Sequence, residues 1–194
     1  MDIIISLFLG ASLAATAGFR AFLPLFLLGL GFRMGWADVY QLAPAFAWLS
    51  STPALIALGS ATIFEIGADK VPAVDTALDT VYTAVRPTAG AVAVLAVISH
   101  DNPLVAYVAA VCLAGGATLP IHLLKTGTRV AANTATAGVA APVKSTCEDV
   151  AALGLGVTAL VAPVVAFVAA LAGGLIAFLL LRRWRARRAK NKDG

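Results

Sequence analysis

Charged residues are scarce in this sequence. They make up 12% of the 194 positions, hydrophobic residues make up 60%, and mean hydropathy is +0.92. A soluble domain carries about 25% charged residues, so there are too few here to cover a surface that faces water. A large soluble domain is excluded, and much of the surface must face lipid. At about 20 residues per membrane helix, the length predicts an all-α polytopic membrane protein of roughly four to six segments.

Cysteine is nearly absent as well. Cys112 and Cys147 are the only two, they form no CxxC pair, and no histidine stands at ligand spacing from either. Both are therefore predicted to be packing residues. The sequence also lacks a complete motif for phosphoryl transfer, proteolysis or acyl transfer, so no catalytic residues are assigned.

Positive charge is concentrated at the C-terminus. Residues 182–194 contain seven Lys and Arg against one Asp, directly after a long apolar run. Such a pattern marks the cytoplasmic side of a membrane segment and suits anionic lipid headgroups as partners. We therefore expect a multi-pass protein of the inner (plasma) membrane with a cytoplasmic C-terminus. The tail has a single aromatic residue, Trp184, and nucleic acid is not an expected partner.

Helix-breaking residues interrupt the long apolar runs. The first run, residues 3–31, is predicted to break or kink within residues 18–24, where proline removes a backbone hydrogen bond. The last run, residues 150–181, is longer than one crossing needs. It is predicted to tilt, or to kink at Pro163 or at Gly173-Gly174.

A cytoplasmic tail has an awkward consequence for three basic residues. With five crossings, the N-terminus lies outside, and so do Lys125, Arg129 and Lys144. That placement opposes the tendency of Lys and Arg to stay inside. We expect these residues to belong to a buried polar core, or residues 125–146 to re-enter the membrane.

Two short, similar motifs suggest that the chain consists of two related halves. Gly18-Phe19-Arg20 is matched by Gly127-Thr128-Arg129, and each half has a Glu at a hydrophobic boundary, Glu65 and Glu148. Transporters built from two repeats place a binding site between broken helices of their halves. The expected units are one transmembrane domain over residues 1–181, with candidate halves 1–101 and 102–181, and the basic tail 182–194.

Charges embedded among apolar neighbours are the most informative residues. Six are basic and six are acidic, so they can neutralise one another. A charge at the bilayer centre costs about 2.5–3.5 kcal/mol even on a lenient scale, which implies pairing across helices or access to water. The residues predicted to form a polar core or transport path are Arg20, Glu65, Asp69, Lys70, Asp75, Asp79, Arg129, Asn133 and Glu148. The other embedded charges are Arg86, Lys125, Lys144 and Asp149.

Structural roles compete with this interpretation at several positions. Ser145-x-x-Glu148 fits a capping box at a helix start, and Asp75 fits a helix cap. His122 is predicted to be a packed or interfacial histidine. Arg20 and Glu65 are each flanked by a long apolar stretch, and they are the strongest functional candidates.

Two segments carry a resemblance to a known family. The residues Thr16-Ala17-Gly18-Phe19-Arg20-Ala21-Phe22-Leu23-Pro24 and the stretch from Glu65 to Asp75 resemble the small bacterial membrane family catalogued as domain of unknown function 4126. The resemblance covers nearly the whole chain. It implies a multi-pass helical membrane protein and brings no established activity or site residues.

A looser similarity concerns cation/proton exchangers whose repeats carry Glu-x-Gly-Asp-Lys. Here Ala68 is inserted before Asp69-Lys70, which rotates the Asp by about 100° on a helix. The insertion also places Glu65 and Asp69 four apart on one face, where two carboxylates can hold a hard divalent cation. No other cofactor is expected.

Three functions therefore compete. The first is a small transporter or channel for an ion or small solute through the charged intramembrane site. The second is a non-catalytic membrane scaffold or assembly protein, in which ion pairs fix the helix register and a homo-oligomer is a candidate assembly. The third is a metal-dependent, lipid-modifying membrane enzyme that uses Asp69, Asp75 and Asp79.

Overall fold

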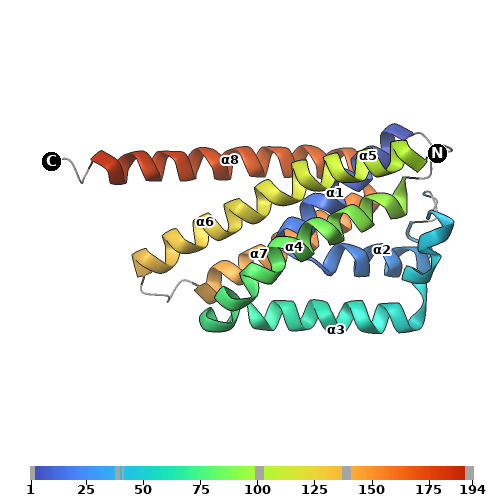
Figure 1. Cartoon of the computed structure of the whole chain (residues 1–194), viewed down its shortest axis with the longest axis horizontal. Helices are drawn as coiled ribbons and strands as arrows, with labels where there is room; N and C mark the ends of the chain where they lie inside the picture. Colours follow the sequence, from blue (N-terminus) through green and yellow to red (C-terminus); the bar gives the residue numbers. More distant parts are fainter. Residues whose placement is uncertain (1–2, 38–39, 41, 99–102, 137–140, 191–194) are drawn as a thin grey trace.

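All regular structure in the described part of the chain is helical (Figure 1). The computed structural model describes residues 3–37, 40, 42–98, 103–136 and 141–190. The expectation of an all-α polytopic protein is confirmed. In order, the elements are α1 (Ile3–Phe19), α2 (Leu23–Arg33), the 3₁₀ helix η1 (Pro44–Ser50), α3 (Thr52–Ala68), α4 (Pro72–Val97), α5 (Pro103–Leu113), the π-helical turn η2 (Ala114–Thr118), α6 (Leu119–Thr136), α7 (Ala141–Val161) and α8 (Pro163–Lys190).

Helices α1 and α2 form a hairpin that enters the bundle and returns. The predicted break falls at residues 20–22, between the two helices. Gly10 in α1 packs on Val94 near the end of α4. Beyond α2, the backbone N–H of Ala43 donates to the carbonyl oxygen of Ala96 at 2.9 Å. Both outer ends of the hairpin therefore lie where α4 finishes, and its tip lies inside the molecule (Figure 1).

Helix α3 follows the 3₁₀ helix η1 after a sharp bend, and α4 contains an internal proline. Helices η1 and α3 meet at 68°. The bend falls at Ser51, whose hydroxyl accepts a hydrogen bond from the backbone N–H of Ala54 at 3.4 Å and so caps α3. Helix α4 is 26 residues long and stays helical at Pro87, which lies within it. The two helices thus connect opposite ends of the molecule (Figure 1).

Helices α5 and α6 form one run, joined by the π-helical turn η2. This wider turn contains Gly115-Gly116, and π turns of this kind are often found at functional sites. The Thr118 hydroxyl donates to the carbonyl oxygen of Ala14 at 2.7 Å. A β-carbon added at Gly18 would lie 2.7 Å from Cβ of Ile121. Small side chains therefore allow α1 and α6 to pack in close contact.

The final apolar run contains a reversal. Helix α7 ends at Val161 and α8 begins at Pro163, and α8 runs back alongside α7 and α6 (Figure 1). The break falls at Pro163, one of the two positions predicted for a kink, and the chain reverses there instead of tilting as one helix. Pro163 lacks a backbone N–H and disfavours a helical conformation at Ala162. Gly173-Gly174 continue within α8.

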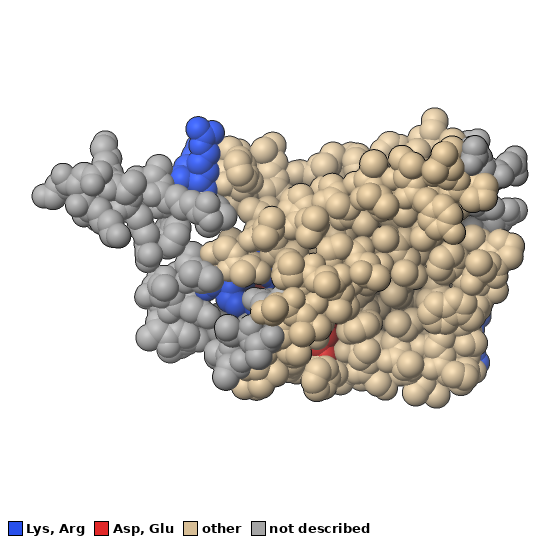
Figure 2. Space-filling view, viewed as in Figure 1, with Lys and Arg blue, Asp and Glu red and all other residues tan. Residues whose placement is uncertain are grey.

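The helices are long and apolar enough for a membrane. Among the described residues, three helical stretches can cross one, or four if η1 and α3 count as one bent span. The stretch in α8 is the least packed, with 11% of its residues buried. Among the described residues on the face shown in Figure 2, almost all are uncharged, and charged side chains show at only a few places. This surface fits lipid rather than water.

The hairpin decides at which end of the molecule the basic residues lie. Because α1 and α2 return to the end from which they started, α6 runs toward the same end of the molecule as the C-terminus (Figure 1). Lys125 and Lys144 therefore lie toward the end that carries the basic tail. Arg33, at the end of α2, lies at the opposite end.

Tight packing around the hairpin yields a stability prediction. In Gly18→Ala, the new β-carbon would lie 2.7 Å from Cβ of Ile121 and 2.8 Å from the carbonyl oxygen of Thr118. Overpacking of this kind costs about 1–3 kcal/mol. We expect a lower unfolding temperature in detergent. Gly154→Ala is the control, because its β-carbon would meet nothing within 4 Å; equal unfolding temperatures would contradict the described contact.

Candidate functional site

Arg20 lies at the tip of the hairpin and joins three parts of the chain. Its side chain is fully buried. The Nη1 atom donates to Oδ2 of Asp69 at 2.6 Å and to the carbonyl oxygen of Glu65 at 3.2 Å. The Nη2 atom donates to Oγ of Ser145 at 3.3 Å and to the carboxylate of Asp149. One guanidinium therefore ties the hairpin to the end of α3 and the start of α7.

Glu65 supplies the missing cap of α2. Phe22, which precedes α2, offers no side-chain cap. Instead, the buried carboxylate of Glu65 accepts hydrogen bonds from the backbone N–H groups of Ala21 at 3.1 Å and Phe22 at 3.5 Å. A negative charge is also favoured at the positive end of a helix dipole. A residue of α3 thus satisfies the backbone groups that the break exposes.

Asp69 lies among three cations. Its Oδ2 atom is 2.6 Å from Arg20, 2.6 Å from Lys125 and 3.4 Å from Arg129. Three positive charges around one buried carboxylate favour its ionised form. Lys125 also donates to the carbonyl oxygen of Phe19 at 3.2 Å, at the end of α1.

The first turns of α7 complete the arrangement. Glu148 pairs with Lys144 one turn earlier, and its Oε2 atom is 3.6 Å from Nζ of Lys125. Asp149 pairs with Arg20 and, at 3.2 Å, with Lys70. We call the whole set the charged cluster: Arg20, Glu65, Asp69, Lys70, Arg86, Lys125, Arg129, Lys144, Glu148 and Asp149.

A second arginine extends the charged cluster along α4. Arg86 of α4 is fully buried, and its Nη2 atom is 3.4 Å from Oε1 of Glu65. Its Nη1 atom lies 2.6 Å from Nδ1 of His122. Because Arg can only donate, Nδ1 must accept, and the neutral imidazole carries its proton on Nε2. Nε2 lies 3.2 Å from the Thr83 hydroxyl. His122 is therefore packed, as predicted, and it also orients Arg86.

The structure brings most of the predicted site residues together. Arg20, Glu65, Asp69, Lys70, Arg129 and Glu148 all belong to the charged cluster. The side chains of Asp75, Asp79 and Asn133 lie outside the described residues. The two Gly-x-Arg motifs of the candidate repeat meet at one carboxylate, because Arg20 and Arg129 both contact Asp69.

The site selected from the sequence omitted several members. Lys125, Arg86, Lys144 and Asp149 are embedded charges that were not selected for it, and Ser145 and His122 carried only structural expectations. One available signal was the spacing of His122, Lys125 and Arg129, which places the three on one face of α6.

The arrangement leaves the predicted divalent cation site untested. Within the residues that the structure describes, no three His, Cys, Asp or Glu side chains lie close enough together to hold a metal ion. Glu65 and Asp69 both face arginine or lysine groups of the protein. A cation there would compete with these groups.

Apolar helices around a buried charged cluster define a polytopic helical membrane protein. The chain belongs to the family described as Domain of unknown function (DUF4126), whose model matches residues 7–183. The resemblance carried by the two sequence segments is therefore confirmed. No curated protein and no solved structure matches the chain. The function must be argued from the charged cluster itself.

Removal of Asp69 tests the energetics of the charged cluster. Asp69→Asn leaves Arg20 and Lys125 buried without their shared counter-charge, and breaking such a pair costs about 3–5 kcal/mol. We expect a large drop in unfolding temperature in detergent, partly restored in the double variant Asp69→Asn/Lys125→Met. Lys70→Met is the control, because the Lys70 side chain is 41% exposed and its ion pair is worth about 0–1 kcal/mol. Equal losses from Asp69→Asn and Lys70→Met would contradict this account.

Proposed function

We propose that the protein is a small transporter or channel for an ion or small solute, with the hairpin tip and the charged cluster as its site. One observation carries the proposal: a broken helical hairpin ends at fully buried Arg20, inside a bundle whose other helices supply its counter-charges. Intramembrane ionisable groups mark ion and solute paths by default. Broken helices at the membrane midplane form the sites of many transporters.

Glu65 is the proposed release point of the hairpin. Its carboxylate accepts from the backbone N–H of Ala21 and pairs with Arg86. A proton or cation that neutralises this carboxylate weakens both interactions, so the hairpin tip and Arg86 become available to a solute. Two states of the tip, held and released, supply the two arrangements that a gated path requires.

The proposed setting is the plasma membrane, with the C-terminus in the cytoplasm. The basic tail lies at the same end of the molecule as the charged segments that end α6 and begin α7 (Figure 1). The excess of Lys and Arg on cytoplasmic loops supports that orientation.

A scaffold role is the second candidate, and the close, fully buried ion pair of Arg20 and Asp69 favours it. Ion pairs that only fix helix register need no solute. The two functions differ in what Glu65 does. A releasable Glu65 controls flux, whereas a structural Glu65 affects folding alone.

The test is flux through proteoliposomes. Vesicles with purified protein receive gradients of H⁺, Na⁺, K⁺, Cl⁻ or phosphate, each followed with a matching fluorescent indicator. We expect flux of at least one probe above empty vesicles, and a loss of tenfold or more in Glu65→Gln, which keeps the size of the side chain.

Arg33→Gln is the matched control for this experiment. Arg33 lies at the other end of α2, where it donates to the Thr52 hydroxyl at 2.7 Å. Flux through the Arg33→Gln variant should equal flux through the wild type. Absence of protein-dependent flux for every probe, or equal flux in Glu65→Gln and the wild type, would overturn the transport proposal and favour the scaffold.

A further inference from the structure

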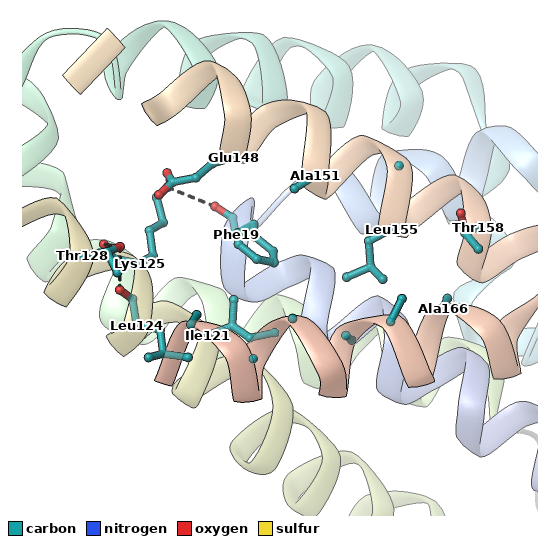
Figure 3. A pocket seen from close by; sticks show the side chains of 16 residues that line it. Phe19, Ile121, Leu124, Lys125, Thr128, Glu148, Ala151, Leu155, Thr158 and Ala166 are labelled. Carbon is teal, nitrogen blue, oxygen red and sulfur yellow. Dashed lines mark hydrogen bonds and ion pairs between the residues drawn. The ribbon is translucent and has the colours of Figure 1, made fainter. Parts of the chain in front are cut away.

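A cavity of about 380 Å³ opens between α6, α7 and α8, and one end of it adjoins Phe19 beside the hairpin tip (Figure 3). Its volume lies within the usual range of about 300–1,000 Å³ for small-molecule sites. The lining comes from one face of each helix, with Phe19 of α1 beside them. We call this cavity the α8 groove.

The α8 side of the groove is lined only by Ala and Gly, and the α7 side also contains small residues. From α7 the lining includes Ala151 and Gly154, and from α8 it includes Ala166, Gly173 and Ala177. A β-carbon added at Gly154 or Gly173 would meet nothing within 4 Å, so these glycines leave real space. The groove follows the helix axes (Figure 3), which is also the direction of lipid chains in a bilayer. A hydrocarbon chain matches this length and lining.

Polar side chains gather at one end of the α8 groove, where Lys125, Thr128 and Glu148 lie together (Figure 3). The Glu148 side chain is 10% exposed. Its Oε2 atom is buried and accepts no hydrogen bond from the described residues. Two cations balance the charge of this oxygen from 3.6 and 3.7 Å, but its hydrogen-bonding capacity is unused, and a ligand that donates a hydrogen bond would use it.

The surrounding charges restrict the donor to a neutral group. Oε2 of Glu148 has Nζ of Lys125 at 3.6 Å and Nη2 of Arg129 at 3.7 Å. An ammonium headgroup would meet both cations, whereas a hydroxyl meets no such repulsion. The same two cations favour an anionic phosphate nearby.

We propose that the α8 groove binds a membrane phospholipid whose headgroup carries a hydroxyl, as phosphatidylglycerol does. One acyl chain lies along the small residues of α7 and α8, and the headgroup hydroxyl donates to Oε2 of Glu148. This site goes beyond the proposed transport function, because it lies on the lipid-facing flank. It also touches the charged cluster through Lys125 and Glu148, so an occupying lipid contacts residues that hold the hairpin.

A second groove provides an internal control. It has a volume of about 840 Å³, lies between α8 and the α5–α6 run, and is lined almost entirely by apolar side chains, with Cys112, Phe167 and Phe178 among them. None of its lining residues is charged. Lipid chains should enter it without regard to headgroup.

The test is photo-crosslinking in nanodiscs of phosphatidylcholine. Trace lipids carry a diazirine in one acyl chain and differ only in headgroup: phosphatidylglycerol, phosphatidylmethanol (equal charge without a hydroxyl) or phosphatidylcholine. Mass spectrometry locates the labelled residues. We expect phosphatidylglycerol to label the α8-groove face of α7, around Gly154, at least fivefold more than either other lipid. Labelling around Cys112 should be equal for all three.

A blocked groove separates specific binding from general lipid contact. Ala177→Leu places a larger side chain in the α8 groove, and we expect it to reduce phosphatidylglycerol labelling around Gly154 at least fivefold. Ala172→Leu makes the same change on α8 at a position that lines neither groove, and labelling should not change.

Two outcomes would overturn the proposal. Equal labelling around Gly154 by phosphatidylglycerol and phosphatidylmethanol would exclude recognition of the hydroxyl. Unchanged labelling in Ala177→Leu would exclude the α8 groove as the place where the lipid binds. The headgroup comparison uses wild-type protein, so its result can be interpreted even if the Ala177→Leu variant fails to fold. Neither outcome tests the proposed transport function, which depends on the separate flux measurement with Glu65→Gln.

Discussion

The buried guanidinium of Arg20 is the interaction on which the rest of the architecture depends. An interrupted helix inside a bilayer exposes backbone N–H groups and, here, a positive charge, and neither can be left unpaired in hydrocarbon. Arg20 binds Asp69 and Asp149, while Glu65 binds the backbone beside it. The hairpin, the end of α3 and the start of α7 are therefore held at one point. Without these acceptors, the break would have no stable place within the bundle.

Close packing allows the charged cluster to form at that depth. Gly18 and Thr118 bring α1 against the α5–α6 run, and Gly90 of α4 adjoins Thr118 from another side. Because these contacts are made by small residues, the longer side chains of Lys125 and Arg86 can reach inward to the hairpin tip. Small residues along the helix contacts and large ionic groups at the tip are thus two parts of one arrangement.

Local chemistry made part of this structure predictable. Scarce charge indicated helices in lipid, proline and glycine marked the break before α2, and the apolar neighbours of Arg20 and Glu65 identified both as unusual. Longer-range features were not predictable in this way. The reversal at Ala162 depends on which face α8 finds to pack against, since a proline alone is compatible with a kink. The contact between Arg86 and His122 joins residues 36 positions apart, and only the course of the chain decides that they meet.

The span of sequence between Arg20 and its partners sets an order of assembly. During synthesis, Arg20 emerges 45 residues before Glu65 and 129 residues before Asp149. A nascent hairpin that entered the bilayer early would hold an unneutralised guanidinium until Asp69, 49 residues later, had been made. Its second counter-charge, Asp149, arrives only with α7. The pairing of Arg20 is therefore completed in two stages, and a chain that ends before α7 would keep the first ion pair and lack the second.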